Sequence, residues 1–124
     1  DSAALSDLNA ITHKYVGIEL QRRLREFAMS GGTLAAIDAI ELFSSGTNRR
    51  CFKTVAVLSD KENRVKRIMA RDGITREYAL LRIAAQHDDG YYAEKCDYTL
   101  YNNADIDSFG NDCRQLFKEM FSNG

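Results

Sequence analysis

No stretch of the sequence approaches the roughly 20 consecutive apolar residues that a membrane-spanning helix needs. The N-terminus also lacks the charged-then-apolar pattern of a secretory signal. A net charge of −1 and a pI near 6.1 exclude the basic character that is typical of a general nucleic-acid-binding domain. We therefore expect a cytoplasmic protein that has neither a membrane nor a nucleic acid as its partner.

The residues that bind metals or break helices are also scarce. The chain has three widely spaced cysteines, Cys51, Cys96 and Cys113, without a Cys-x-x-Cys pair or a cluster of histidines. We therefore expect reduced thiols and assign no metal ligand. Proline is absent altogether, and we attach no function to its absence.

One well-known device for binding phosphate is missing. A phosphate-binding loop reads Gly-x-x-x-x-Gly-Lys-[Ser/Thr], in which backbone amides and the lysine hold the phosphates and the hydroxyl binds magnesium. The sequence contains no Gly-Lys dipeptide. The closest segment, Gly31-Gly32, follows a helical pattern and has no lysine.

The apolar residues that are present follow helix and strand periods in alternation. Helices are predicted from Leu5 to about Met29 and from Asp105 to Phe121, and strands over 33–40, 53–58 and 97–101. This order predicts a single α/β domain with a parallel sheet between helices. The side chains expected to face inward are Leu8, Ile11, Tyr15 and Ile18 in the first helix, and Ile106, Phe109, Cys113, Leu116, Phe117 and Met120 in the last.

Positive charge is concentrated between Lys61 and Arg82. This segment has seven basic and three acidic side chains. Two short helices are predicted here. The first starts at a capping box formed by Ser59 and Glu62 and ends at Gly73, and the second is capped by Thr75.

Three arginines of the first of these helices, Arg64, Arg67 and Arg71, share one face at helical spacing. Guanidinium groups hold phosphate oxygens through paired hydrogen bonds and stay charged, which suits the spread negative charge of a transferring phosphoryl group. A helical hairpin that swings over a nucleotide also excludes water. The other interpretation is a solvated basic face on a helix that packs its apolar side on a core.

Three motifs carry a resemblance to a known family. They are Arg67-x-x-x-Arg71-Asp72-Gly73-x-Thr75, Arg82-Ile83-x-Ala85-Gln86 and Asp97-Tyr98-x-x-x-Asn102-Asn103. Together they closely resemble the lid and last strand of dephospho-CoA kinases. The resemblance implies ATP-dependent phosphorylation of the ribose 3′-hydroxyl of dephospho-CoA, in coenzyme A biosynthesis, with magnesium.

The same resemblance, which runs from about Leu8 to Phe121, implies the later part of a phosphate-loop nucleoside-kinase-like fold of three layers, with a parallel sheet and a helical lid. Residues 1–60 are expected to form a core helix and two strands, residues 61–90 the lid, and residues 91–124 the last strand and helix. The family's phosphate loop and catalytic aspartate fall before Asp1. We therefore interpret the chain as a C-terminal fragment, inactive alone, with weak or absent binding of ATP and magnesium.

The resemblance also implies a nucleotide site. Arg67 and Arg71 are expected to be catalytic and to bind ATP, and Gln86, Asn102 and Asn103 to complete the ATP site. Gln86 also fits a role in capping helix carbonyls, and Asn102-Asn103 also fits ordinary turn chemistry.

Two further residues fall on substrate-side segments of the family. His13 lies where the family has His-Pro, with Lys14 in place of the proline, and Asp38 begins the segment 38–43, which also lacks the family's proline. Both are expected to bind dephospho-CoA, with Asp38 at the carboxyl end of a strand. The alternatives are a packed or surface histidine and an aspartate that caps a loop.

Two other functions remain open. The chain is also compatible with another phosphate-loop nucleotide kinase, acting on cytidylate or adenylate, because lids with paired arginines occur there. A stand-alone, non-catalytic domain that binds a nucleotide or a protein is the third possibility. A sheet without its upstream strands is expected to expose core surface and to self-associate.

Overall fold

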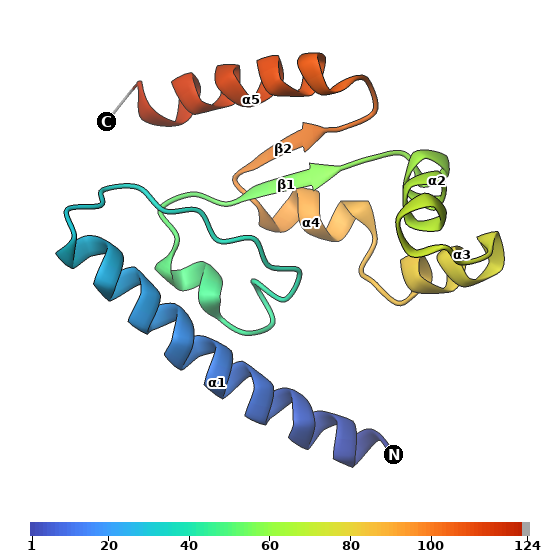
Figure 1. Ribbon diagram of the computed structural model, residues 1–124, viewed down its shortest axis with the longest axis horizontal. Coiled ribbons are helices and arrows are strands. Elements are labelled where there is room, and N and C mark those ends of the chain that lie inside the picture. The colour runs from blue at the N-terminus through green and yellow to red at the C-terminus, as the bar shows by residue number, and fades with distance from the viewer. Residues whose placement is uncertain (123–124) are drawn as a thin grey trace. The chain divides into compact units, whose positions relative to one another are not determined.

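The computed structural model describes residues 1–122, which form two compact units that divide after Cys51 (Figure 1). We describe each unit by itself. The elements are α1 (Ser2–Met29), a 3-10 helix η1 (Thr47–Arg50), β1 (Val55–Leu58), α2 (Lys61–Asp72), α3 (Arg76–Ala84), α4 (Asp89–Lys95), β2 (Tyr98–Tyr101) and α5 (Ile106–Phe121). None of these helices is long and apolar enough to cross a membrane.

Helix α1 begins earlier than predicted and ends as predicted. The Asp1 carboxylate accepts a hydrogen bond from the Ala3 N–H at 3.0 Å, which caps the helix three residues before Leu5. At the other end, Gly31 adopts a left-handed φ of +93°, which favours glycine. The ring of Phe27 lies against Gly32 so closely that a Cβ there would stand 2.2 Å from it.

The apolar stripe of α1 has no cover within the described residues. No side chain of α1 is buried, and Leu8 is 59 % exposed. Ile11, Tyr15 and Ile18 are exposed to a similar degree. The stripe has the predicted spacing, but the expectation that it faces inward is wrong within residues 1–51, because no other part of this unit buries it.

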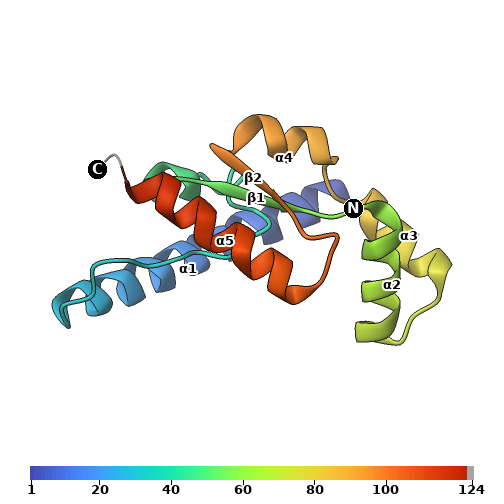
Figure 2. The same ribbon diagram turned by 90° about the horizontal axis from the view of Figure 1, so that it is seen from above.

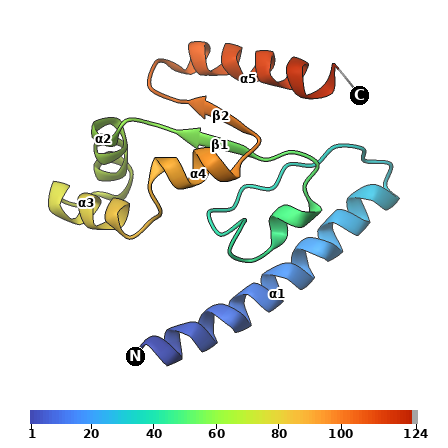
Figure 3. The same cartoon turned by 180° about the vertical axis from the view of Figure 1, so that it is seen from behind.

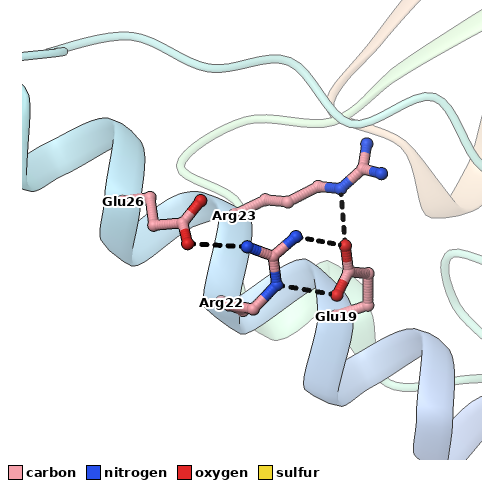
Figure 4. A network of polar contacts seen from close by, with 4 residues as sticks. All are labelled: Glu19, Arg22, Arg23 and Glu26. Carbon is pink, nitrogen blue, oxygen red and sulfur yellow. Dashed lines mark hydrogen bonds and ion pairs between the residues drawn. The ribbon is translucent and has the colours of Figure 1, made fainter.

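A cluster of ion pairs lies in the C-terminal half of α1 (Figure 4). Arg22 donates to the two carboxylate oxygens of Glu19 at 2.9 and 2.6 Å and to Glu26 at 2.6 Å, and Arg23 donates to Glu19 at 2.9 Å. These bonds, led by those from Arg22, lower the pKa of Glu19 to about 2. Because all four side chains are exposed, water and salt screen the pairs, which therefore contribute little stability.

The strand predicted over 33–40 is not formed. This segment has no regular secondary structure and joins no ladder, and the sheet of the described residues has two strands rather than the expected three. An apolar run becomes a strand only where another strand pairs with its backbone groups. Here β1 and β2 pair with each other, and neither pairs with this segment.

The parallel sheet itself is confirmed. Val55 pairs with Tyr98 and Leu58 with Tyr101, and both arrows point the same way in Figure 1. Seen from above in Figure 2, the two strands lie between α4 and α5, as they also do in Figure 1. The buried apolar side chains of this α/β unit are Ala56, Leu58, Val65, Ala79 and Leu116.

Helix α5 covers the sheet with part of its expected face. Leu116 is buried, and Phe109, Cys113 and Met120 are half-buried. The prediction is wrong for Ile106, which is 85 % exposed in the first turn, and for Phe117, because two strands are too narrow to cover the whole apolar face of a 16-residue helix.

Asp97 joins the beginnings of the two strands. Its carboxylate accepts hydrogen bonds from the Thr54 N–H at 2.8 Å and from the Thr54 hydroxyl at 3.1 Å, and its own N–H donates to that hydroxyl oxygen. These bonds lower the pKa of Asp97, with the backbone bond as the largest cause. Thr54 is buried, so both of its donors depend on Asp97.

We expect Asp97→Ala to lower the free energy of unfolding by about 1–2 kcal/mol, because it leaves the buried donors of Thr54 without an acceptor. The loss is small because Asp97 itself is exposed, so water replaces part of the lost hydrogen bonding. Urea denaturation at pH 7 measures the change. Asp112→Ala, which removes an exposed carboxylate from α5, is the control, and equal midpoints for the two variants would refute the role of Asp97.

Candidate functional site

The candidate site lies where β1 and β2 end. Both strands are parallel, so their carboxyl ends meet at one edge, where Leu58 faces Tyr101. The chain continues from β1 into α2, and the hairpin of α2 and α3 lies beyond the β1 arrowhead in Figures 1 and 3. The Asn102 N–H donates to the Leu58 carbonyl at 2.7 Å and extends the pairing by one step. This edge is where open α/β sheets bind ligands.

The side chain of Ser59 connects the two strand ends. Its hydroxyl lies 3.0 Å from the Asn102 carbonyl and 3.0 Å from the Asn103 Oδ1. The predicted capping box is therefore wrong: Asp60 is the N-cap of α2, and Glu62 pairs with Arg76 instead. The physical reason is that acceptors from the end of β2 occupy the serine.

Arg67 reaches back over this edge from α2. Its Nη1 donates to the Ser59 hydroxyl at 3.1 Å and its Nη2 donates to the Asn102 carbonyl at 2.8 Å. Both acceptors are neutral, and Arg67 has no carboxylate partner within residues 1–122. The positive charge of Arg67 is therefore not neutralised, which suits a group that is to receive an anion.

The other arginines of α2 and α3 each have a carboxylate partner. Arg71 donates to both oxygens of Asp72 at 2.8 Å, and Arg82 from α3 pairs with the same carboxylate. Arg76 pairs with Glu62 at 2.5 Å, and Arg64 lies 3.5 Å from Asp89. The face shared by Arg64, Arg67 and Arg71 is thus divided among three different sets of partners.

The turn between α2 and α3 lies where the sequence predicts it. Gly73 adopts a left-handed φ of +63° as the C-cap of α2, and the Thr75 hydroxyl accepts from the Tyr78 N–H at 3.3 Å to cap α3. Both features are confirmed. Asp72 adds a link across this turn, since it binds an arginine from each helix.

Those ion pairs hold the pKa of Asp72 at about 2, below its ordinary value of 3.8, with the hydrogen bond from Arg71 as the largest cause. Because the pKa of Asp72 is lower in the folded state than in the unfolded state, the ion pairs stabilise the fold fully at pH values above the pKa of the unfolded state. Their contribution is lost as the pH falls from about 4 through about 2.

We therefore expect the Asp72 carboxyl carbon, followed by NMR, to titrate near pH 2, and we expect Arg71→Ala to move its midpoint up toward 3.8. Salt should raise the midpoint as well, because the pair is exposed. A midpoint near 3.8 in the unmodified chain would contradict the ion-pair geometry.

The remaining candidates for ATP binding lie at the same edge or beside α2. Asn102 and Asn103 follow β2 directly and contact Ser59. Gln86 follows α3, and its Oε1 accepts from Arg64 Nη2 at 2.9 Å. The structure therefore brings Arg67, Asn102 and Asn103 together, and it places Gln86 on Arg64 rather than on Arg67.

The two substrate-side candidates lie in residues 1–51. His13 is half-buried on α1, and Asp38 is exposed in the segment 33–40, which has no regular secondary structure. Asp38 therefore does not end a strand, which corrects the expected placement. Neither side chain makes a hydrogen bond or an ion pair within the described part of the chain.

Two features of the site were not predicted. Ser59 was interpreted as a local cap, whereas it binds residues that are more than 40 positions away. Asp72 was interpreted only as part of a motif, although its position directly after Arg71 was a signal for the pairing found. For metal binding, residues 1–122 contain no group of three or more His, Cys, Asp or Glu side chains placed to hold an ion.

Sequence comparison finds the same family that the sequence motifs resemble. The family model described as dephospho-CoA kinase matches residues 1–108. A dephospho-CoA kinase from Corynebacterium glutamicum is 31 % identical over 115 residues, which are 93 % of this chain and 58 % of that protein. One from Geobacter sulfurreducens is 31 % identical over 121 residues, 98 % of this chain and 61 % of that protein. The chain thus spans about three-fifths of the length of these relatives.

Solved structures agree on the fold. A crystal structure from Thermus thermophilus aligns with a TM-score of 0.73 and 27 % identity, over 96 % of this chain and 61 % of that one. A dephospho-CoA kinase from Campylobacter jejuni aligns with a TM-score of 0.61 and 22 % identity. The alignment covers 99 % of this chain and 61 % of that one. Since the family model matches most of the residues, the chain belongs to the dephospho-CoA kinase family.

Proposed function

We propose that this chain is the later part of a cytoplasmic kinase that phosphorylates the ribose 3′-hydroxyl of dephospho-CoA with ATP. The observation that carries the proposal is Arg67, whose guanidinium lies at the ligand edge of the parallel sheet on neutral acceptors only. A kinase needs an uncompensated cation at the place where the phosphates lie. The family match supports the choice of substrate.

In this reaction the oxygen of the ribose 3′-hydroxyl forms a bond to the γ-phosphorus of ATP and gives up its proton to solvent. The bond from that phosphorus to the β–γ bridging oxygen breaks, and ADP leaves. Negative charge spreads over the equatorial oxygens of the γ-phosphoryl group. Arg67 and Arg71 stabilise that charge and bind ATP. Arg71 does so by exchanging the Asp72 carboxylate for a phosphate, since both are anions that accept two hydrogen bonds from one guanidinium.

The other assigned residues bind the two substrates. Asn102, Asn103 and Gln86 contribute to the ATP site, and His13 and Asp38 contact dephospho-CoA. Magnesium neutralises the phosphates of ATP in such transfers. Residues 1–122 contain no group of three or more His, Cys, Asp or Glu side chains that could hold the ion.

The reading frame upstream of Asp1 discriminates between the proposal and a stand-alone binding domain. We expect it to encode Gly-x-x-x-x-Gly-Lys-[Ser/Thr] after a strand, and we call the longer chain with that loop the complete polypeptide. An initiating methionine a few codons before Asp1 would favour the stand-alone domain instead. A cytidylate- or adenylate-specific kinase is distinguished by its phosphate acceptor, because it would phosphorylate a nucleotide rather than dephospho-CoA.

We also expect the 124-residue chain to self-associate at micromolar concentration, because the stripe of α1 is exposed, with Ile11 at 56 %. Light scattering over a range of concentrations measures this. Ile11→Glu should shift the chain toward the monomer, and Asn9→Glu, outside the stripe, should not. A monomer at all concentrations would refute this expectation.

A further inference from the structure

Asn103 accepts three hydrogen bonds at one atom. Its Oδ1 lies 2.7 Å from the Asp60 N–H donor nitrogen, 3.0 Å from the Ser59 hydroxyl and 3.3 Å from the Asn63 Nδ2. All three donors belong to the end of β1 and the first turn of α2, whereas Asn103 follows β2. A backbone N–H can only donate, so the atom facing Asp60 must be the oxygen, and this fixes the orientation of the side-chain amide.

The N-terminus of α2 has no capping hydrogen bond from a side chain within the helix or its N-cap residue. Its N-cap residue, Asp60, makes no side-chain capping bond, unlike Asp1, Thr75 and Asp105 at other helices of the chain. The first N–H groups of a helix need acceptors from outside its own ladder. Asn103, 43 residues further along the chain, supplies an acceptor for the N–H of Asp60, the residue directly before the helix.

A second connection lies next to the first. The Asn102 carbonyl accepts from Arg67 Nη2 at 2.8 Å, and the Ser59 hydroxyl lies between Asn102, Asn103 and Arg67. The start of α2 and its second turn are therefore both bound to the two residues that follow β2. Because these bonds act together, the direction in which α2 leaves the sheet depends on them.

We infer that Asn103 is a positioning residue that fixes the root of the lid, where β1 passes into α2, to the end of β2 and so holds Arg67 over the ligand edge. The anchoring follows from the hydrogen bonds alone. Its consequence for phosphoryl transfer rests on the proposed function. The role is separate from ATP binding, since anchoring uses the Oδ1, whereas the Nδ2 makes no hydrogen bond within residues 1–122 and is available to a nucleotide.

Amide hydrogen exchange of the 124-residue chain tests the anchor directly. Asn103→Ala removes the acceptor of the Asp60 N–H, and we expect the amides of Asp60 and of Arg64, which donates to the Asp60 carbonyl, to exchange roughly fivefold faster. Asn103→Asp keeps an oxygen acceptor and adds a negative charge at a helix N-terminus, which is favourable, so exchange should stay near that of the unmodified chain. The amides of β1 report whether the fold is intact.

Asn102→Ala is the matched control for exchange, because Asn102 acts through its backbone carbonyl and the variant keeps that atom. It should leave the exchange of the Asp60 and Arg64 amides unchanged. Unchanged exchange in Asn103→Ala, or equal acceleration in Asn103→Ala and Asn103→Asp, would overturn the anchor, since the second result means that the oxygen is not the group that matters.

Turnover of the complete polypeptide tests the consequence. Asn103→Ala should lower kcat about fivefold or more, and Asn103→Asp should restore kcat while raising the KM for ATP, because it loses the amide donor but keeps the acceptor. Equal kcat values for Asn103→Ala and the unmodified enzyme would refute the positioning role. If the complete polypeptide makes no coenzyme A at all, the proposed function fails, and the exchange measurement still decides the anchor.

Discussion

Arg67→Ala in the complete polypeptide is expected to lower kcat for coenzyme A formation by roughly a thousandfold, the size of effect commonly found for arginines that stabilise phosphoryl transfer. The reason is the uncompensated charge of Arg67 at the ends of β1 and β2, where no carboxylate partner weakens it. Arg71→Ala should lower kcat by a similar order. Steady-state rates, with circular dichroism to verify folding, measure both changes.

The conservative and control variants sharpen this test. Arg67→Lys should recover only part of the rate, because an ammonium group cannot reproduce the planar pair of donors. Arg76→Ala removes a lid arginine whose partner is Glu62, and it should change kcat little, since exposed ion pairs contribute little. Equal and small effects at Arg67, Arg71 and Arg76 would mean that the arginines form only a solvated face.

The 124-residue chain alone is expected to form no coenzyme A above the enzyme-free background. Its sequence has no Gly-Lys dipeptide, so it lacks the amides, lysine and hydroxyl that position the phosphates and magnesium in this reaction. Mass spectrometry after incubation with ATP, magnesium and dephospho-CoA measures the product. Magnesium-dependent coenzyme A formation by the pure chain would refute the prediction, with the complete polypeptide as the positive control.

Local signals predicted the hairpin of α2 and α3 well. The stop at Gly73 and the cap at Thr75 depend on φ preferences and on side chains within three residues, all visible in the sequence. The paired strands were also predictable, since 53–58 and 97–101 are short apolar segments next to helical patterns. Their parallel pairing followed from the alternation of strands and helices.

Features that depend on distant partners were not predictable. The segment 33–40 has the composition of a strand, but pairing is a property of two segments, and no described strand accepts it. Ser59 has the spacing of a helix cap, yet acceptors from Asn102 and Asn103 compete for its hydroxyl. The stripe of α1 shows which side of the helix is apolar, but not whether this chain covers it.

The candidate site was predicted in part for the same reason. Arg67, Asn102 and Asn103 were named separately, and the parallel register brings them to one edge. Helical spacing grouped Arg67 with Arg71, but it cannot show that the neighbouring Asp72 pairs with Arg71. The assigned roles of these residues, and those of Gln86, His13 and Asp38, stay predictions.

The phosphate acceptor that the complete polypeptide chooses decides whether it is a dephospho-CoA kinase. Dephospho-CoA, cytidylate and adenylate are supplied separately with ATP and magnesium, and each product is identified by mass spectrometry and phosphorus NMR. We expect rapid transfer to dephospho-CoA alone, with the new phosphate on the ribose 3′-hydroxyl. Faster transfer to cytidylate or adenylate, or a phosphate on any other position of dephospho-CoA, would contradict this expectation.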